Sequence, residues 1–346
     1  MKSLLVFFFI LFIPLISAAD NYTQLDVPTS YLFGIPELSI REGTSATAIN
    51  DNSEYIGTFG QRDWVFWGVP HAFIHTLNPL DQNPSIIGDI GTDNNYKYLD
   101  FPGSGGLASA LGNNITMPSG INNSGNVVGT YIDANGAYQG FEYSNNSFSL
   151  FDVPGAISTN AKSINNQGTI AGTFQDANGT YNGFVLNGGI FTEFDAPNAS
   201  ATYINGINDY GDMVGTVITS TGKHGFLYHN GSYSLIDYSN SSHTEANGIN
   251  NNGVIVGDYT DSMGNHGFAE QGLSFTSIDK LGALNTYANG INNSGEIIGT
   301  YFDGSDHGYL TSITSITSIT PVPVPAAVWL FSSALAVFGL FGRKSA

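Results

Sequence analysis

The chain has 346 residues, 43 glycines and no cysteine, and it carries 28 acidic residues against nine basic ones. The lack of cysteine excludes a disulfide framework and a cysteine-based metal site. Three of the basic residues lie in the terminal segments, so the body is strongly acidic, which disfavours nucleic acid and anionic lipid as partners.

The N-terminal 19 residues have the three parts of a secretory signal. A positive start at Lys2 is followed by an apolar run from Leu4 to Ile16 and then by small residues ending at Ala19. The run is short for a membrane anchor and contains Pro14. We therefore expect residues 1–19 to direct export and cleavage to follow Ala19.

The body is organised by a repeated step, Gly-Ile-Asn-Asn-x-Gly, or a close variant of it, followed by a short apolar strand. Its isoleucines are separated by 72, 43, 43, 42 and 42 residues, and they are Ile49, Ile121, Ile164, Ile207, Ile249 and Ile291. A fixed period near 43 residues indicates a repeat architecture. The Asn and Gly of the step tolerate the positive φ angles of tight hairpins, so we expect the step to join the first two strands of each unit.

Each unit holds four strand-like pieces, and two irregularities indicate how the units close. A copy of the fourth piece stands alone at residues 22–28, before the first unit, whereas the last unit has no fourth piece after Tyr309. Six units of four strands therefore come out even only if the N-terminal strand completes the last one. This arrangement predicts an all-β fold, a six-bladed β-propeller over residues 20–312 in which the pairing of the two ends removes an exposed sheet edge.

A glycine follows the repeat isoleucine by eight residues in all six units, for example Gly57 and Gly257. In the middle of a strand, such a residue predicts close approach of a neighbouring strand or blade.

The units also resemble the HAF repeat family of exported bacterial proteins, named for a His-Ala-Phe step that stands here at residues 71–73. Later units read His-Gly-Phe or His-Gly-Tyr, and Gln139 and Asn182 take the place of the histidine in two of them. The resemblance covers nearly the whole body. It implies fold and export, and it carries no activity.

The C-terminal residues form a spacer and an apolar tail. A polar low-complexity spacer at 313–320 leads to a Pro-rich step and then to the apolar run 326–342, which ends in two basic residues. Seventeen residues at about 1.5 Å each barely cross a hydrocarbon core. The basic pair would stay in the cytoplasm, so we expect the body to lie outside, with membrane contact through this helix only.

Residues 321–346 resemble the PEP-CTERM sorting tail of Gram-negative bacteria, in its Val-Pro-Leu-Pro-Ala variant. The residues that carry this resemblance and the basic end are Val322, Pro323, Val324, Pro325, Arg343 and Lys344. The resemblance implies an exosortase-like processing enzyme as a partner, besides the export machinery, and delivery to the cell surface or matrix. The glutamate of the commonest version is absent, and a permanent single-span anchor is the alternative.

The repeated polar residues of the blades favour structural roles. Histidines at equivalent places in different blades point around a wide circle, too far apart for a shared zinc ion, whereas Gln139 or Asn182 could fill a hydrogen-bonding role equally well. The Asp that ends each fourth strand is expected to cap a turn. We therefore expect no cofactor, although the turns that begin at Asp133, Asp176 and Asp261 resemble fragments of calcium loops and leave a weak calcium site open.

The repeat is broken in the first unit, and a site is best sought there. Its loops are longer than those of the other units, and one of them holds Arg62, Asp63, Trp64 and Trp67. Loops on a rigid scaffold often carry function, and tryptophan faces stack well on sugar rings. These four residues are the candidate ligand site, unless the loops only cover the junction where the ring closes.

Three functions remain in view. The first is an exported, non-catalytic surface or matrix protein that binds polysaccharide or other envelope components. The second is a carbohydrate-active enzyme, because a propeller can bring distant acids together, although no nucleophile elbow or zinc-protease motif is present and no pair of the 28 acids stands out. The third is a calcium-dependent adhesin. Fold alone cannot choose among them.

Overall fold

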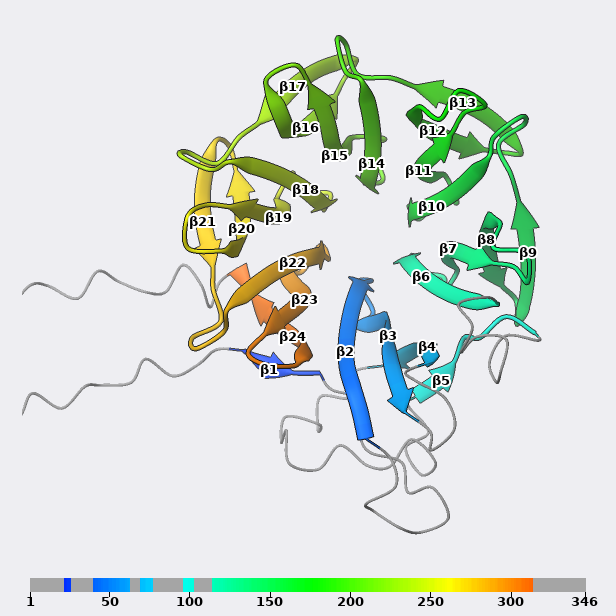
Figure 1. Ribbon diagram of the computed structural model, residues 1–346, viewed down its shortest axis with the longest axis horizontal. Coiled ribbons are helices and arrows are strands. Elements are labelled where there is room, and N and C mark those ends of the chain that lie inside the picture. Colours follow the sequence, from blue (N-terminus) through cyan, green and yellow to red (C-terminus); the bar gives the residue numbers. More distant parts are fainter. Residues whose placement is uncertain (1–21, 26–39, 63–68, 77–95, 103–113, 314–346) are drawn as a thin grey trace, which may run out of the picture.

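The computed structural model describes residues 22–25, 40–62, 69–76, 96–102 and 114–313. These residues form six four-stranded antiparallel sheets arranged as blades around a central axis (Figure 1). The first strand of each blade lies nearest the axis and the fourth lies at the rim. The prediction of a six-bladed β-propeller is confirmed.

The blades follow one another along the chain. Blade 1 contains β2 (Ile40–Ile49), β3 (Glu54–Arg62), β4 (Val69–Thr76) and β5 (Tyr96–Tyr98). Blade 2 contains β6 (Ile115–Ile121), β7 (Val127–Ile132), β8 (Tyr138–Ser144) and β9 (Ser147–Phe151). Blade 3 contains β10 (Ser158–Ile164), β11 (Ile170–Gln175), β12 (Tyr181–Asn187) and β13 (Ile190–Phe194).

The second half of the ring repeats this order. Blade 4 contains β14 (Ala201–Ile207), β15 (Met213–Thr219), β16 (Gly222–His229) and β17 (Ser232–Ile236). Blade 5 contains β18 (His243–Ile249), β19 (Ile255–Thr260), β20 (Asn265–Gln271) and β21 (Ser274–Ile278). Blade 6 contains β22 (Asn285–Ile291), β23 (Glu296–Phe302), β24 (Asp306–Ser312) and, from the other end of the chain, β1 (Thr23–Gln24).

The N-terminal strand closes the ring as expected. Thr23 pairs with Leu310 and Gln24 with Tyr309, and the amide of Leu25 donates a 2.8 Å hydrogen bond to the carbonyl of Gly308. Leu25 is only 2% exposed and belongs to the apolar cluster between blades 6 and 1. The first strand is thus packed into the last blade as well as hydrogen-bonded to it.

Apolar side chains fill the six spaces between neighbouring blades, one cluster to each space. The aromatic residue of the His-x-Phe step is buried in every blade, as Phe73, Phe141, Phe184, Phe226, Phe268 and Tyr309. Opposite it on the second strand lies the repeated glycine, eight residues after the isoleucine. A Cβ on Gly257 would lie 1.9 Å from the carbonyl oxygen of Glu245 and 2.9 Å from the ring of Phe268, which confirms the expected close approach.

Candidate functional site at the ring axis

The Asn-Asn-x-Gly step does form the first hairpin of each blade, and its first asparagine also binds the next blade. The Oδ1 atom of Asn250 accepts the backbone amides of Asn252 and Val254, both at 3.0 Å, which holds the turn. Its Nδ2 donates to the carbonyl of Asn292, its counterpart in blade 6, at 3.0 Å. The same bond, at 2.9 to 3.3 Å, joins every neighbouring pair around the axis and closes a ring through Asn50, Asn122, Asn165, Asn208, Asn250 and Asn292.

The second residue of the step forms another closed ring beside the first. Its side-chain Oδ1 accepts the backbone amide of the counterpart in the preceding blade, at 2.7 to 2.9 Å in all six blades. The members of this ring, in order, are Asp51, Asn123, Asn166, Asp209, Asn251 and Asn293. Twelve hydrogen bonds therefore tie the six blades together around the axis, which fixes the positions of these side chains.

The two aspartates of the second ring lie in opposite blades, and this placement satisfies the four asparagines. Asp51 Oδ2 accepts Nδ2 of Asn123 and of Asn293, both at 2.8 Å. Asp209 Oδ2 accepts Nδ2 of Asn166 and of Asn251, at 2.8 and 2.7 Å. Each asparagine of this ring thus donates its side-chain amide to one carboxylate, and each carboxylate accepts from the asparagine on either side of it.

The hydrogen bonds also act on the charge of Asp209. Burial raises its pKa, but the bonds from the Asn251 side chain and from the backbone and side chain of Asn166 outweigh burial, so the pKa is lowered overall. The carboxylate is therefore ionised at neutral pH and presents a fixed negative charge at the axis.

The two rings line a polar hollow of about 70 Å³ where the axis meets this face of the propeller. Tyr210, which directly follows Asp209 in the turn, is 75% exposed, and the other five turns have Asn, Ser or Gln in its place. The hollow therefore presents closely spaced donors and acceptors, and the residue that follows Asp209 in the chain is an exposed aromatic. The six repeat isoleucines line its floor, each 5 to 8% exposed.

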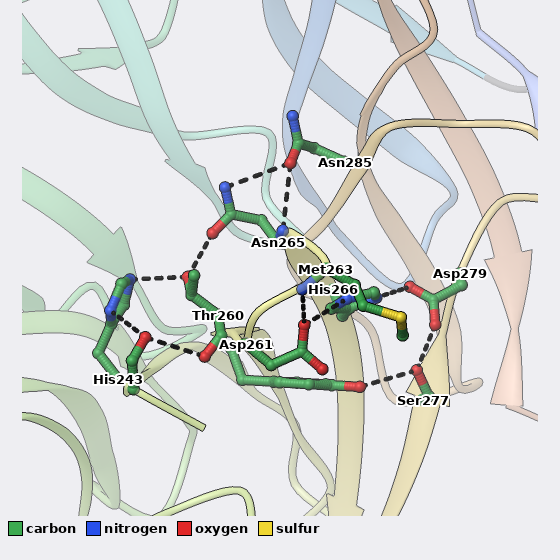
Figure 2. A network of polar contacts seen from close by, with 11 residues as sticks. His243, Thr260, Asp261, Met263, Asn265, His266, Ser277, Asp279 and Asn285 are labelled. Atoms are coloured by element: carbon green, nitrogen blue, oxygen red, sulfur yellow. Dashed lines mark hydrogen bonds and ion pairs between the residues drawn. The ribbon is translucent and has the colours of Figure 1, made fainter. Parts of the chain in front are cut away.

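The histidines of the third strands make the hydrogen bonds expected of a structural role. Figure 2 shows His266 in blade 5 between two carboxylates, with Nδ1 2.9 Å from Asp279 and Nε2 3.2 Å from Asp261. His71 and His224 contact the aspartates that end their fourth strands at 2.7 and 2.8 Å. In blade 2, Gln139 donates to Asp152 at 2.9 Å, so a neutral amide fills the same role. These contacts join the third strand to the end of the fourth.

The three aspartates proposed for calcium face their own turns. The Oδ1 atoms of Asp133 and Asp176 each accept two backbone amides, which lowers the pKa of both carboxyls, and Asp261 accepts the amide of Met263 at 2.7 Å (Figure 2). Within the described ranges, no group of three or more His, Asp or Glu residues is placed to hold a metal ion.

A pair of acids stands out in blade 5. Glu245 and Asp258 are direct partners across β18 and β19, and Glu245 forms an ion pair with Lys223 of blade 4. Asp258 is 7% exposed and accepts Nδ2 of Asn247 at 2.8 Å. Burial, with a further contribution from the charge of Glu245, raises its pKa to about 7, although Asn247 and Lys223 act in the opposite direction. The other five blades have threonine at this place.

Several predicted features lie outside the described residues. They include Asp63, Trp64 and Trp67, both terminal segments with Ala19 and the sorting step, and the side chain of Arg62, whose backbone ends β3. Among the described residues, there is no helix long and apolar enough to span a membrane.

The axial rings were missed as a site, although the sequence carries a trace of them. The residue after the first asparagine reads Asp, Asn, Asn, Asp, Asn, Asn around the six units. The pattern repeats after three units and so places the two aspartates in opposite blades. A role in forming the turn alone does not require this placement.

Comparisons with known proteins do not assign a family. No family model and no curated protein matches the chain. A fucose-specific lectin from Aleuria aurantia is similar in structure at 12% identity, over 83% of this chain and 94% of that one, with a TM-score of 0.47. AofleA from Arthrobotrys oligospora matches at 10% identity, over 80% and 84%, with a TM-score of 0.46.

A sialidase from Trypanosoma rangeli, solved in complex with the inhibitor DANA, matches at 7% identity with a TM-score of 0.47. The match covers 92% of this chain and 62% of the sialidase. The structural neighbours thus include a lectin and a sialidase.

Proposed function

We propose that the protein is a non-catalytic binding module for polysaccharide or other envelope components, exported and displayed at the cell surface or in the matrix. The observation that carries the proposal is the axial hollow, where the carboxylates of Asp51 and Asp209 and four asparagine amides surround a polar cavity. The exposed Tyr210 directly follows Asp209 in the chain and supplies an aromatic ring next to this step. Sugars present hydroxyl groups and an apolar ring face, which are the partners that such a surface can accept.

Two features of the hollow favour binding over catalysis. Its polar groups are held by mutual hydrogen bonds, so they meet a ligand without a loss of side-chain freedom. Both carboxylates already accept two amide groups each through Oδ2, and the bonds to Asp209 lower the pKa of that carboxyl, which makes it a poor proton donor. The Trp64 and Trp67 loop of blade 1 remains part of the proposal as a second contact region.

A glycan-binding screen of the secreted protein tests this function. We expect Tyr210→Ala to weaken binding about tenfold, because stacking on an aromatic ring is lost. Tyr138→Ala is the matched control, since Tyr138 is 43% exposed on the third strand of blade 2, away from the axis. The variant with Trp64 and Trp67 changed to Ala tests the blade 1 loop. The proposal would be wrong if the protein bound no glycan, or if binding were unaffected by the changes at Tyr210, Trp64 and Trp67.

The alternatives give different results in the same experiments. Release of reducing sugars by the wild-type protein would favour a carbohydrate-active enzyme, with Glu245 and Asp258 as the acids to change first, because their environments differ and Asp258 holds a proton near neutral pH. If glycan binding requires calcium and calcium also raises the melting temperature, the calcium-dependent adhesin is favoured. Mass spectrometry of the secreted form shows whether cleavage occurs after Ala19 and near residues 322–326.

A further inference from the structure

All six innermost strands carry a β-bulge at the same place. The register of each first strand with its second shifts by one residue, two positions before the repeat isoleucine. A bulge re-aims the extra side chain, and here all six extra residues line the wall around the axis. They are Thr47, Ser119, Lys162, Asn205, Asn247 and Asn289.

Four of these residues bind the next blade. Thr47 Oγ1 donates to the carbonyl of Pro118 at 3.1 Å, and Nδ2 of Asn205, Asn247 and Asn289 donates to the corresponding carbonyl of its neighbour at 2.8 to 3.1 Å. Lys162 and Ser119, in the adjacent blades 3 and 2, do not follow this pattern. Among the residues that the structure describes, neither side chain has a hydrogen-bond or ion-pair partner.

The bulge residues surround a cavity of about 110 Å³ on the other side of the isoleucines from the Asn and Asp rings. Of its eighteen lining residues, Lys162 is the one with a charged side chain, and no carboxylate is present. Burial lowers the pKa of the Lys162 ammonium. A cation held among neutral groups lowers stability unless an anion joins it.

Lys162 does not make the bond between blades that its counterparts in four blades make. Threonine or asparagine fills the same place in four blades and makes a tie that Lys162 does not make. The strands of blades 2 and 3 are also close here, since a Cβ on Gly120 would lie 2.8 Å from the Cα of Ser163. The unpaired ammonium and the Ser119 hydroxyl therefore project from neighbouring strands that approach each other closely.

We propose that Lys162 and Ser119 bind the carboxylate of a hydroxycarboxylate inside this cavity, either a free sugar acid or the end of an acidic glycan. The ammonium and the hydroxyl donate to the carboxylate oxygens. In blades 4, 5 and 6, Oδ1 of Asn205, Asn247 and Asn289 has no donor among the described residues. In the proposed complex, these three oxygens accept hydrogen bonds from the hydroxyl groups of the ligand. The site is separate from the axial hollow of the proposed function.

Calorimetric titration of the whole protein with D-glucuronate tests the proposal, with D-glucose and acetate as probes of the two halves of the chemistry. We expect saturable binding of glucuronate, weaker binding of acetate, which lacks the hydroxyl groups, and none of glucose. A short oligoglucuronide separates the two sources: tighter binding than free glucuronate indicates a glycan end, and equal or weaker binding indicates a free sugar acid.

The decisive variant is Lys162→Asn, because asparagine already occupies the equivalent place in three blades and is compatible with the fold. It should weaken glucuronate binding about 10- to 100-fold, the usual range for losing a charged hydrogen bond. Lys162→Gln provides a second variant, and the melting temperature reports whether each is folded. Lys97→Asn, an exposed lysine on the rim strand of blade 1, is the control for net charge and should bind as the wild type does.

Three results would overturn the proposal: no binding of glucuronate or its oligomer, equal binding of glucose or acetate, or glucuronate binding that survives both Lys162 variants. The two proposals fail separately. Tyr210→Ala should leave glucuronate binding unchanged, and Lys162→Asn should leave the binding of neutral glycans unchanged.

Discussion

At the scale of single residues, the chain uses side-chain amides in place of backbone pairing to join its blades. Blades of a propeller are separate sheets, so their innermost strands share no ladder with one another. The first asparagine of each step solves this problem with one side chain, because an amide group can accept with its oxygen inside the turn and donate with its nitrogen to the next blade. Aspartate could hold the turn but could not make the second bond.

The buried carboxyl of Asp258 gives a prediction about stability, because its pKa differs from that of the unfolded chain. The pKa is raised from 3.8 to about 7 by burial, so the unfolded chain loses its proton at lower pH than the folded one. Unfolding is therefore favoured increasingly as pH rises from about 4 to about 7, by up to roughly 4 kcal/mol. Asp258→Thr restores the residue of the other five blades and should stabilise the fold by up to roughly 4 kcal/mol at pH 7.5, with the gain shrinking toward zero near pH 4.

Thermal melts of wild type and variant across this pH range measure the effect. Thr216→Asp, the reverse change at the equivalent place in blade 4, is the matched control and should destabilise in the same pH-dependent manner. A stabilisation by Asp258→Thr that is equal at pH 4 and pH 7.5 would show that the charge of Asp258 is not its cause.

At the scale of the element, the sequence predicts the strands and turns of a blade more completely than it predicts the arrangement of residues around the axis. The turn glycines, the close-approach glycines and the buried aromatic each follow from one residue type at one place, so a repeat of 43 residues displays them six times. The bulge has no such signature, because Ala48 or Ser163 follows it in two blades and glycine in the other four. Hence the bulge residues and Lys162 were not identified.

The two kinds of glycine in the first hairpin should respond differently to substitution. Gly257→Ala places a methyl group 1.9 Å from the backbone carbonyl oxygen of Glu245 and 2.9 Å from the ring of Phe268, so the backbone of the blade has to shift. We expect a loss of about 3 kcal/mol in the free energy of unfolding, because the first and third strands must separate.

Gly253→Asn, four residues earlier, is the control. Gly253 has a φ of 73° and no atom within 4 Å of an added Cβ, and asparagine tolerates that conformation, so the loss should stay below about 1 kcal/mol. Chemical denaturation measures both variants. Equal losses would mean that backbone conformation, rather than close approach, determines the need for glycine at both places.

At the scale of the whole molecule, counting strands identified the fold, whereas the site depended on distances. The last of the six units lacks its fourth strand, and a copy of that strand stands at the N-terminus. The count is complete only if the ring is closed. Equivalent residues lie far apart at the histidines of the third strands, and that separation was expected. At the inner ends of the first strands they meet, because all six strands converge there (Figure 1). The sequence period is the same for the histidines and for the asparagines. Only the distance of a residue from the propeller axis therefore decides whether its six copies can contact one another in a ring.

Closure of the ring gives the last prediction. The strand β1 is short, but it covers β24 and buries Leu25 and the face of Tyr309, against which Tyr22 packs with ring centroids 5.2 Å apart. Removing residues 1–25 should lower the melting temperature and cause self-association, because β24 becomes an exposed edge that pairs with other chains. Removing residues 1–21, which keeps β1, should do neither. Size-exclusion chromatography and thermal melts compare the two proteins, and a peptide of residues 22–28 added in trans should restore the elution volume of the longer protein to the shorter one by supplying the missing strand. If the two truncated proteins behave alike, the ring is closed by packing between blades 6 and 1, and pairing of the termini is dispensable.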